Sequence, residues 1–152
     1  MSKTLEPKSV VEDQQFATFY VGDVLLGIAI DRVREINRLS EITCVPHAPR
    51  HVLGVVNLRG EVVPLLDLGI LLGLPSTQVG SDSKNMIVQA DGQLLGLVVD
   101  RVSDILAVSH ESMSSPPANV NAVDGRMIQG IHTLPDDVVI LLDIDQALAN
   151  SQ

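Results

Sequence analysis

The sequence contains very few aromatic residues. Its 152 residues include two Phe, one Tyr and no Trp. Hydrophobic residues nevertheless make up 45% of the chain, so the core has to be built from Val, Ile and Leu. A core of this composition favours strands over helices.

Long hydrophobic runs and paired cysteines are also missing. The longest apolar runs, 24–30 and 94–99, are far shorter than the roughly 18 residues that span a bilayer. The first 15 residues are polar and lack the apolar segment of a secretory signal. The single cysteine, Cys44, cannot form an internal disulfide. These absences predict a cytoplasmic protein with no direct membrane insertion.

Positive charge is scarce as well. Ten Lys and Arg face 19 Asp and Glu, which gives a formal net charge of −9. This charge opposes binding to phosphate backbones, so nucleic acid is not an expected partner. No glycine-rich phosphate-binding motif is present either, and the sequence predicts no cofactor.

An internal repeat organises the chain. Residues 54–68 read GVVNLRGEVVPLLDL and align without a gap with GIHTLPDDVVILLDI at 130–144. Residues 25–36, LLGIAIDRVREI, align in the same way with LLGLVVDRVSDI at 94–105. The chain therefore contains two related halves. Residues that both halves keep, such as Asp31 and Asp100 or Arg32 and Arg101, are expected to serve the fold.

The spacing of apolar runs and turns predicts ten short strands. Strands are expected at 15–21, 24–30, 32–42, 54–58, 61–67, 85–90, 93–99, 101–108, 126–134 and 138–142. Short helices are expected at 49–52, at 68–72 and from 144 to 149. This pattern indicates an all-β fold of two small barrels. We expect a flexible segment at 1–14 and one domain at 15–150, divided into subdomains at 15–80 and 81–150.

Two groups of residues resemble catalytic or metal sites. Cys44, His47 and His51 have part of the spacing of a zinc site, but prolines interrupt the segment and no fourth ligand is near. Asp67 and Asp143 occupy equivalent positions, as the two carboxylates of an aspartic protease do, but the residues around them lack that motif. Helix capping explains both aspartates, and the sequence predicts neither a metal site nor an enzyme.

The strongest candidate for recognition is Arg59. It precedes Gly60 at the turn of the predicted 54–68 hairpin, where the second half has Pro135 and Asp136 instead. The fold therefore does not require arginine there. An arginine on a rigid turn is typical of a protein-recognition anchor, although a merely solvated turn is the alternative.

Several spaced motifs resemble the CheW family of bacterial chemotaxis adaptors. They are GVVNLRG at 54–60, PLLDL at 64–68, VREI at 33–36 and VDRVSD at 99–104. The resemblance covers residues 15–148. It implies two five-stranded, SH3-like β-barrels and a non-enzymatic protein that couples the cytoplasmic tips of methyl-accepting chemoreceptors to the regulatory domain of the histidine kinase CheA.

Carried over by position, the receptor-facing residues of the family fall on Val33, Glu35, Gly54 and Arg59. The chain departs from the family at Gly69, where an arginine is common. The resemblance does not identify the kinase-binding surface, for which the edge strands are the expected place. A β-barrel module that binds a small ligand or nucleotide is the alternative function.

Overall fold

The computed structural model describes residues 13–39, 41–75, 79–115, 119–120 and 123–149. The strands are β1 (Asp13–Val21), β2 (Val24–Ala29), β3 (Val33–Arg38), β4 (Val52–Leu58), β5 (Glu61–Asp67), β6 (Lys84–Ala90), β7 (Gln93–Val99), β8 (Arg101–Ser109), β9 (Asn119–Val120), β10 (Val123–Asp124), β11 (Ile128–Thr133) and β12 (Val138–Leu142). The helices are α2 (Leu68–Leu71) and α3 (Ile144–Ala149), with 3-10 turns at Ile30–Arg32, His110–Ser112 and Gly125–Met127. The predicted flexible segment lies outside the described residues as far as residue 12.

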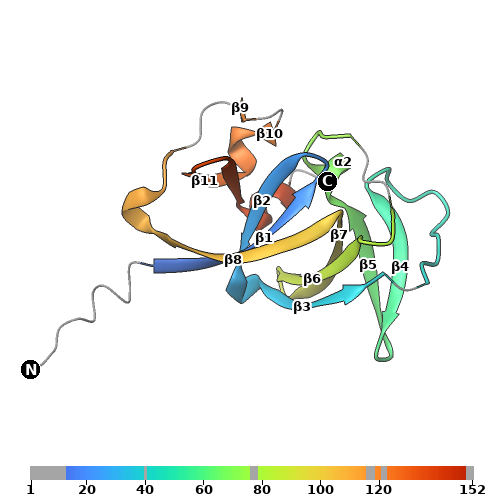
Figure 1. Cartoon of the computed structure of the whole chain (residues 1–152). Helices are drawn as coiled ribbons and strands as arrows, with labels where there is room; N and C mark the ends of the chain where they lie inside the picture. The colour runs from blue at the N-terminus through green and yellow to red at the C-terminus, as the bar shows by residue number, and fades with distance from the viewer. Residues whose placement is uncertain (1–12, 40, 76–78, 116–118, 121–122, 150–152) are drawn as a thin grey trace, which may run out of the picture.

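Two five-stranded sheets form the body of the molecule (Figure 1). One has the strand order β3-β6-β7-β5-β4 and is called the β3/β4 sheet here; the other, the β8/β11 sheet, has the order β11-β12-β2-β1-β8. The expectation of an all-β fold with two five-stranded units and short helices is therefore confirmed.

The two sheets do not follow the predicted subdomain ranges 15–80 and 81–150. The β1–β2 hairpin of the first half lies in the sheet of β8, β11 and β12, and the β6–β7 hairpin of the second half lies with β3, β4 and β5. Parallel pairing of β2 with β12 and of β7 with β5 joins each hairpin to the other half. The halves have therefore exchanged hairpins, which the linear order of the repeat does not reveal.

Each sheet curls so that its two edges come together. Thr43, which follows β3, exchanges backbone hydrogen bonds of 2.9 and 2.8 Å with Val55 on β4. Ser114, which follows β8, does the same with Ile131 on β11 at 2.8 and 2.9 Å. Both bridges occupy equivalent places in the repeat, so closure of the sheets is a shared property of the halves.

The inner strands are apolar on both faces because each face meets a different core. In β12, Ile140 and Leu142 enter a central cluster between the sheets, whereas Val139 and Leu141 enter a cluster inside the β8/β11 sheet. A third cluster, with Val56, Val63, Leu65, Ile87 and Val98, fills the β3/β4 sheet. Strands buried on both sides explain the unbroken apolar runs in the sequence.

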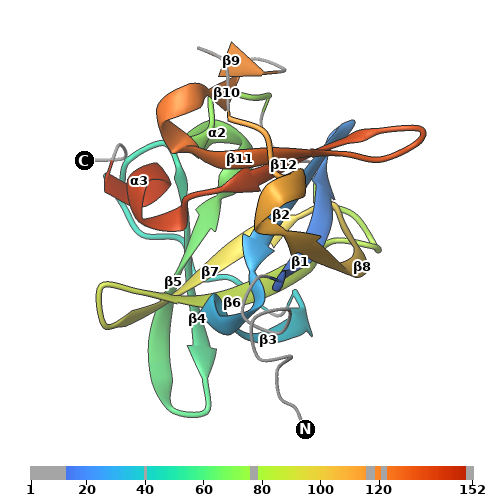
Figure 2. The same ribbon diagram turned by 90° about the vertical axis from the view of Figure 1, so that its left-hand side faces the viewer.

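Residues that the halves share serve the fold, as predicted. Arg32 donates to the Gln89 carbonyl at 3.2 Å and pairs with Asp145 of α3. Its counterpart Arg101 lies over the Tyr20 ring, 4.0 Å from the centroid. Figure 2 shows α3, which carries Asp145, at one side of the molecule.

Local predictions had mixed outcomes. The short helix expected at 49–52 is absent: Val52 donates to Pro49 at 2.9 Å in a single turn, and β4 begins at Val52 because pairing with β5 extends the backbone there. Asp67 and Asp143 do cap helices, since their Oδ1 atoms accept 3.2 Å bonds from Ile70 N and Gln146 N.

None of the helices in the described part of the chain is long and apolar enough to cross a membrane.

Candidate protein-binding site

The tip of the β4–β5 hairpin is a two-residue turn. Leu58 pairs with Glu61, so Arg59 and Gly60 alone form the turn. Both have positive φ, 52° and 87°, as in a type I′ turn. The Asn57 Oδ1 atom accepts a 2.9 Å hydrogen bond from Gly60 N, which stabilises the turn. Glycine accepts this conformation at no cost, but arginine does not, so the backbone of Arg59 is held by the hairpin.

Arg59 forms an ion pair with Glu35 of β3. Its Nη1 donates to Oε1 of Glu35 at 3.2 Å, and its Nη2 donates to Oε2. The Arg59 side chain is 71% exposed and that of Glu35 27%. The Arg59 guanidinium lowers the pKa of the Glu35 carboxyl, with a further contribution from the Asn37 amide, and Glu35 in turn raises the pKa of Arg59. Glu35 lies beside the turn, but strand pairing does not bring it there: β3 pairs with β6, at the edge of the sheet opposite β4, and closure of the sheet brings the two edges together.

The other two residues carried over from the family are not exposed in the same way. Val33 is half-buried and packs against the central cluster. Gly54 is buried with a φ of +154°, and a Cβ there would overlap the Thr43 carbonyl and lie 2.8 Å from Ile42. Gly54 therefore allows the chain after β3 to approach β4, and its place in the site is structural. The structure joins Glu35 and Arg59 in an ion pair, whereas Val33 packs inward and Gly54 is buried.

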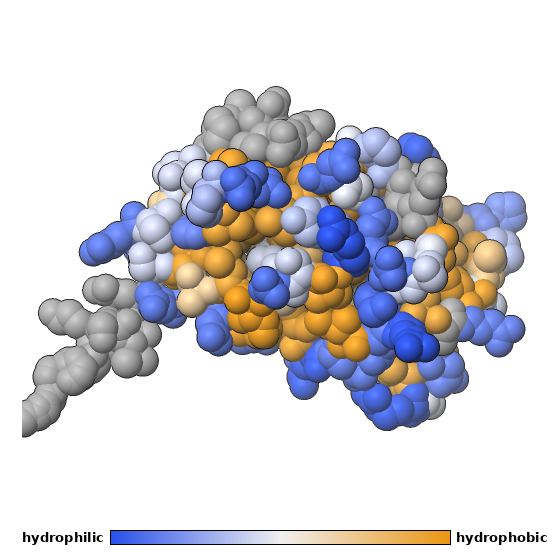
Figure 3. Space-filling model, viewed as in Figure 1, coloured by the Kyte–Doolittle hydropathy of each residue, from blue (hydrophilic) through white to orange (hydrophobic). Residues whose placement is uncertain are grey.

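Exposed apolar residues were not singled out from the sequence. Ile36 on β3 is 39% exposed, Val62 on β5 64%, and Val102 and Ile105 on β8 37% and 60%. Ile36 and Ile105 occupy equivalent positions in the repeat, and this alignment was the signal that could have found them. In the view of Figure 1, Figure 3 shows apolar side chains at the surface across the middle of the molecule, the part that β8 crosses.

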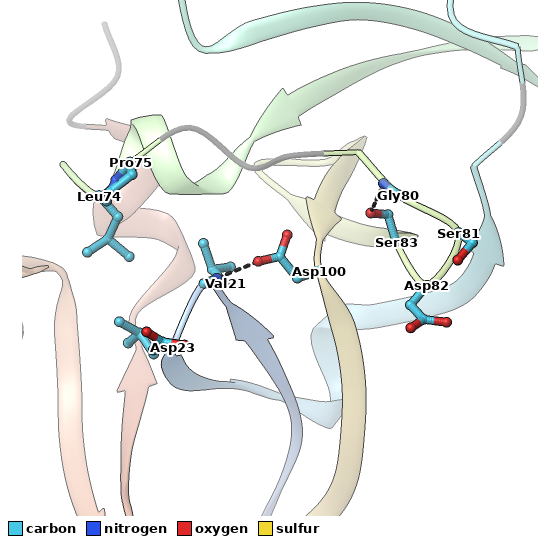
Figure 4. A pocket seen from close by; sticks show the side chains of 11 residues that line it. Val21, Asp23, Leu74, Pro75, Gly80, Ser81, Asp82, Ser83 and Asp100 are labelled. Carbon is cyan, nitrogen blue, oxygen red and sulfur yellow. Dashed lines mark hydrogen bonds between the residues drawn. The ribbon is translucent and has the colours of Figure 1, made fainter.

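A cavity of about 700 Å³ lies between the β1–β2 turn, the segment after α2 and the start of β8. Its lining includes Asp23, Asp82 and Asp100, and Figure 4 shows these carboxyl groups spread around the opening. Asp100 accepts from the Gly22 backbone N–H. No Lys or Arg is among the described residues that line it, so the cavity repels anionic ligands.

The candidate metal ligands Cys44, His47 and His51 do not group into a metal site in the described structure. Cys44 is a free, exposed thiol. Among the described residues, no three His, Cys, Asp or Glu side chains group closely enough to hold a metal ion.

At Gly69, where the family often has arginine, a Cβ would overlap the Pro75 carbonyl, and Leu74 N donates to the Gly69 carbonyl at 2.7 Å. The segment after α2 therefore occupies the space of a side chain at this position.

Comparison with known protein families matches residues 15–152 to the CheW-like domain. Among curated proteins, the chain is 30% identical over 148 residues to the chemotaxis protein CheW of Treponema pallidum, covering 93% of this chain and 87% of the relative. It is 31% identical over 139 residues to CheW of Rhizobium meliloti, covering 91% and 90%.

A solved structure supports the same relationship. The scaffolding protein TtCheW from Thermoanaerobacter tengcongensis superimposes with a TM-score of 0.81 at 29% identity. The match covers 88% of this chain and 86% of that one. The two-sheet fold of this chain is thus that of a known scaffolding protein.

Proposed function

Because the chain belongs to the CheW-like domain family, we propose that it is a cytoplasmic, non-enzymatic adaptor that couples chemoreceptor cytoplasmic tips to a CheA-type histidine kinase. The relatives named CheW are chemotaxis proteins, and the similar solved structure is titled a scaffolding protein. The adaptor would reach the membrane-bound receptor array through its protein partners.

The observation that carries the proposal is the Arg59–Glu35 pair on the hairpin tip. A planar guanidinium on a rigid turn, held in place by a carboxylate, is a preorganised anchor that loses little side-chain freedom on docking. Exposed apolar side chains on β3, β5 and β8 supply area that a protein partner can bury.

We assign different roles to the four receptor-facing residues. Arg59 and Glu35 would contact the receptor directly, because both reach the surface. Gly54 and Val33 would shape this face from beneath, because Gly54 admits the segment after β3 and Val33 anchors β3 to the central core. Substitution at either would alter receptor binding only together with stability.

Titration of a receptor cytoplasmic fragment against Arg59→Ala tests the proposal. We expect binding to weaken by about 1–3 kcal/mol, the range of a modest hot spot. The unfolding midpoint should stay within about two degrees of wild type, since exposed substitutions usually change stability by about 0.5 kcal/mol or less. Binding to the kinase regulatory domain should be largely spared.

Arg126→Ala is a matched control. Arg126 is also an exposed arginine, 78% accessible, in an ion pair with a nearby carboxylate, Asp124, but it lies after β10 rather than on the hairpin tip. It should bind the receptor fragment like wild type. An equal loss of receptor binding in both variants would show that the hairpin tip is not a specific receptor contact. Loss of kinase binding alone in Arg59→Ala would show that the tip faces the kinase instead.

The 700 Å³ cavity supports a second candidate function, binding of a small ligand. Its volume falls within the range of ligand sites. Its acidic lining opposes nucleotides, whose phosphates require cationic or N–H donors. A thermal-shift screen discriminates the two functions: a saturable rise of several degrees with a nucleotide would favour the ligand-binding module over the adaptor.

A further inference from the structure

Asn37 completes a line of hydrogen bonds that ends at Arg59. Its Nδ2 donates to Oε1 of Glu35 at 3.1 Å, and the same carboxylate accepts from both terminal nitrogens of Arg59. The line runs from the end of β3, at one edge of its sheet, to the tip of the hairpin that forms the other edge. Neither the repeat nor any spaced motif singled out Asn37 in the sequence.

We propose that Asn37 is a positioning residue that holds the Glu35 carboxylate and, through it, the Arg59 guanidinium in one orientation for docking. The inference rests on the proposed function, because it refines the face on which the receptor would dock. Asn37 itself is half-buried and acts through Glu35 rather than on the partner.

The strand geometry supports this assignment. Glu35 and Asn37 are two residues apart on β3, so their side chains lie on the same face. Both are half-buried, whereas their neighbours Arg34, Ile36 and Arg38 are exposed on the opposite face. A glutamate on a strand has several rotamers, and the Asn37 amide selects the one that points to the hairpin tip.

The Arg59 guanidinium still has N–H donors for a partner when it is bonded to Glu35. Arginine has five N–H donors in a fixed fork, and Glu35 accepts from the two terminal nitrogens. Among the described residues, no acceptor is bonded to Nε of Arg59. Because the Arg59 side chain is largely exposed, the edge formed by Nε–H and its neighbouring terminal N–H is available to a planar oxygen acceptor, such as a carboxylate or a backbone carbonyl of the receptor.

A double-mutant cycle tests the inference in the full-length chain. Asn37→Ala, Arg59→Ala and the double variant are titrated with the receptor cytoplasmic fragment. We expect Asn37→Ala to weaken binding by about two- to tenfold, as for loss of one hydrogen bond, and to have no further effect once Arg59 is absent. Equal effects in both backgrounds, or wild-type binding by Asn37→Ala, would overturn the inference.

Arg34→Ala provides the control on the same strand. Arg34 bonds to the Gln89 side chain at 2.8 Å on the opposite face of β3, so it reports any general disturbance of this edge. It should bind the receptor fragment as wild type does. A loss equal to that of Asn37→Ala would show that β3 as a whole, and not the hydrogen-bond line, supports docking.

A measurement without any partner separates this inference from the proposed function. The order parameter of the Arg59 Nε–H bond is measured by ¹⁵N relaxation in wild type and Asn37→Ala. We expect a lower order parameter in the variant, with the order parameters of the hairpin backbone unchanged. Unchanged Nε order would overturn the positioning role even if receptor binding is confirmed, and failure of the wild type to bind the receptor would reject only the proposed function.

Discussion

The β3/β4 and β8/β11 sheets are built on the same plan but end in different hairpin tips. Each has a closing bridge after its edge strand, a buried glycine opposite that bridge, and an aspartate that caps the following helix. The β4–β5 hairpin turns through Arg59 and Gly60 alone, whereas the β11–β12 hairpin turns through residues 134–137, where Leu134 N donates to the Asp137 carbonyl at 2.7 Å.

The comparison separates residues that the fold requires from those that it leaves free. Closing bridges, buried glycines and caps recur because two curled sheets need them. The residues at the two apices, Arg59 and Gly60 in one sheet and Pro135 and Asp136 in the other, are exposed and therefore free to differ, and of the two sheets the β3/β4 sheet pairs its tip arginine with a carboxylate on the opposite edge strand. In the other sheet, Asp104 occupies the place of Glu35 without an arginine at the facing tip.

The largest effect is expected when the chain is divided at the predicted subdomain boundary. Fragments 1–80 and 81–152 each lack the hairpin that their sheet receives from the other half. We expect neither fragment alone to unfold cooperatively in urea, and an equimolar mixture to regain the cooperative transition, as followed by far-ultraviolet circular dichroism. A cooperative transition in either isolated fragment would show that the exchanged hairpin is dispensable.

The paired glycines give the next largest effect. Gly54→Ala places a Cβ against the Thr43 backbone at a φ of +154°, so we expect a loss of about 3 kcal/mol in the free energy of unfolding. At Gly130 the nearest atoms belong to the flexible Met113 side chain, and Gly130→Ala should lose about 1 kcal/mol. Urea unfolding of both variants measures the difference; equal losses would mean that the two bridges tolerate crowding alike.

The sequence predicted local elements better than it predicted their partners. The turn at Arg59 and Gly60, the caps and nearly all strands follow from turn chemistry and apolar periodicity. The exchange of hairpins could not be predicted, because inner strands such as β2 and β7 are apolar on both faces and fit either sheet. Asn37 was missed because its role depends on a neighbour two residues away and on a turn brought close only by closure of the sheet.

The two helix caps should differ in their contribution to stability. Asp67 is fully buried and Asp143 only partly, and the bond that Asp67 accepts from Ile70 N is less exposed to water than the bond that Asp143 accepts from Gln146 N. We expect Asp67→Ala to lower the free energy of unfolding by about 2 kcal/mol and Asp143→Ala by about 1 kcal/mol. Chemical denaturation measures both. A variant that keeps wild-type stability but loses partner binding would contradict the capping role.

The smallest expected effect concerns the pH dependence of the tip ion pair, the feature that the β8/β11 sheet lacks. Arg59 lowers the pKa of Glu35 below its usual 4.5 in the folded protein. The pair therefore stabilises the fold at pH values above 4.5, and this contribution is lost as the pH falls through the lowered pKa. The difference in urea midpoint between wild type and Arg59→Ala should be small at pH 7 and should disappear below the lowered pKa. For Arg126→Ala the corresponding difference should persist until the pH approaches 2, because Arg126 lowers the pKa of Asp124 to about 2. A difference for Arg59→Ala that is the same with Glu35 charged and with Glu35 protonated would mean that Glu35 and Arg59 are not paired in solution, and the ion pair would then not distinguish the two sheets.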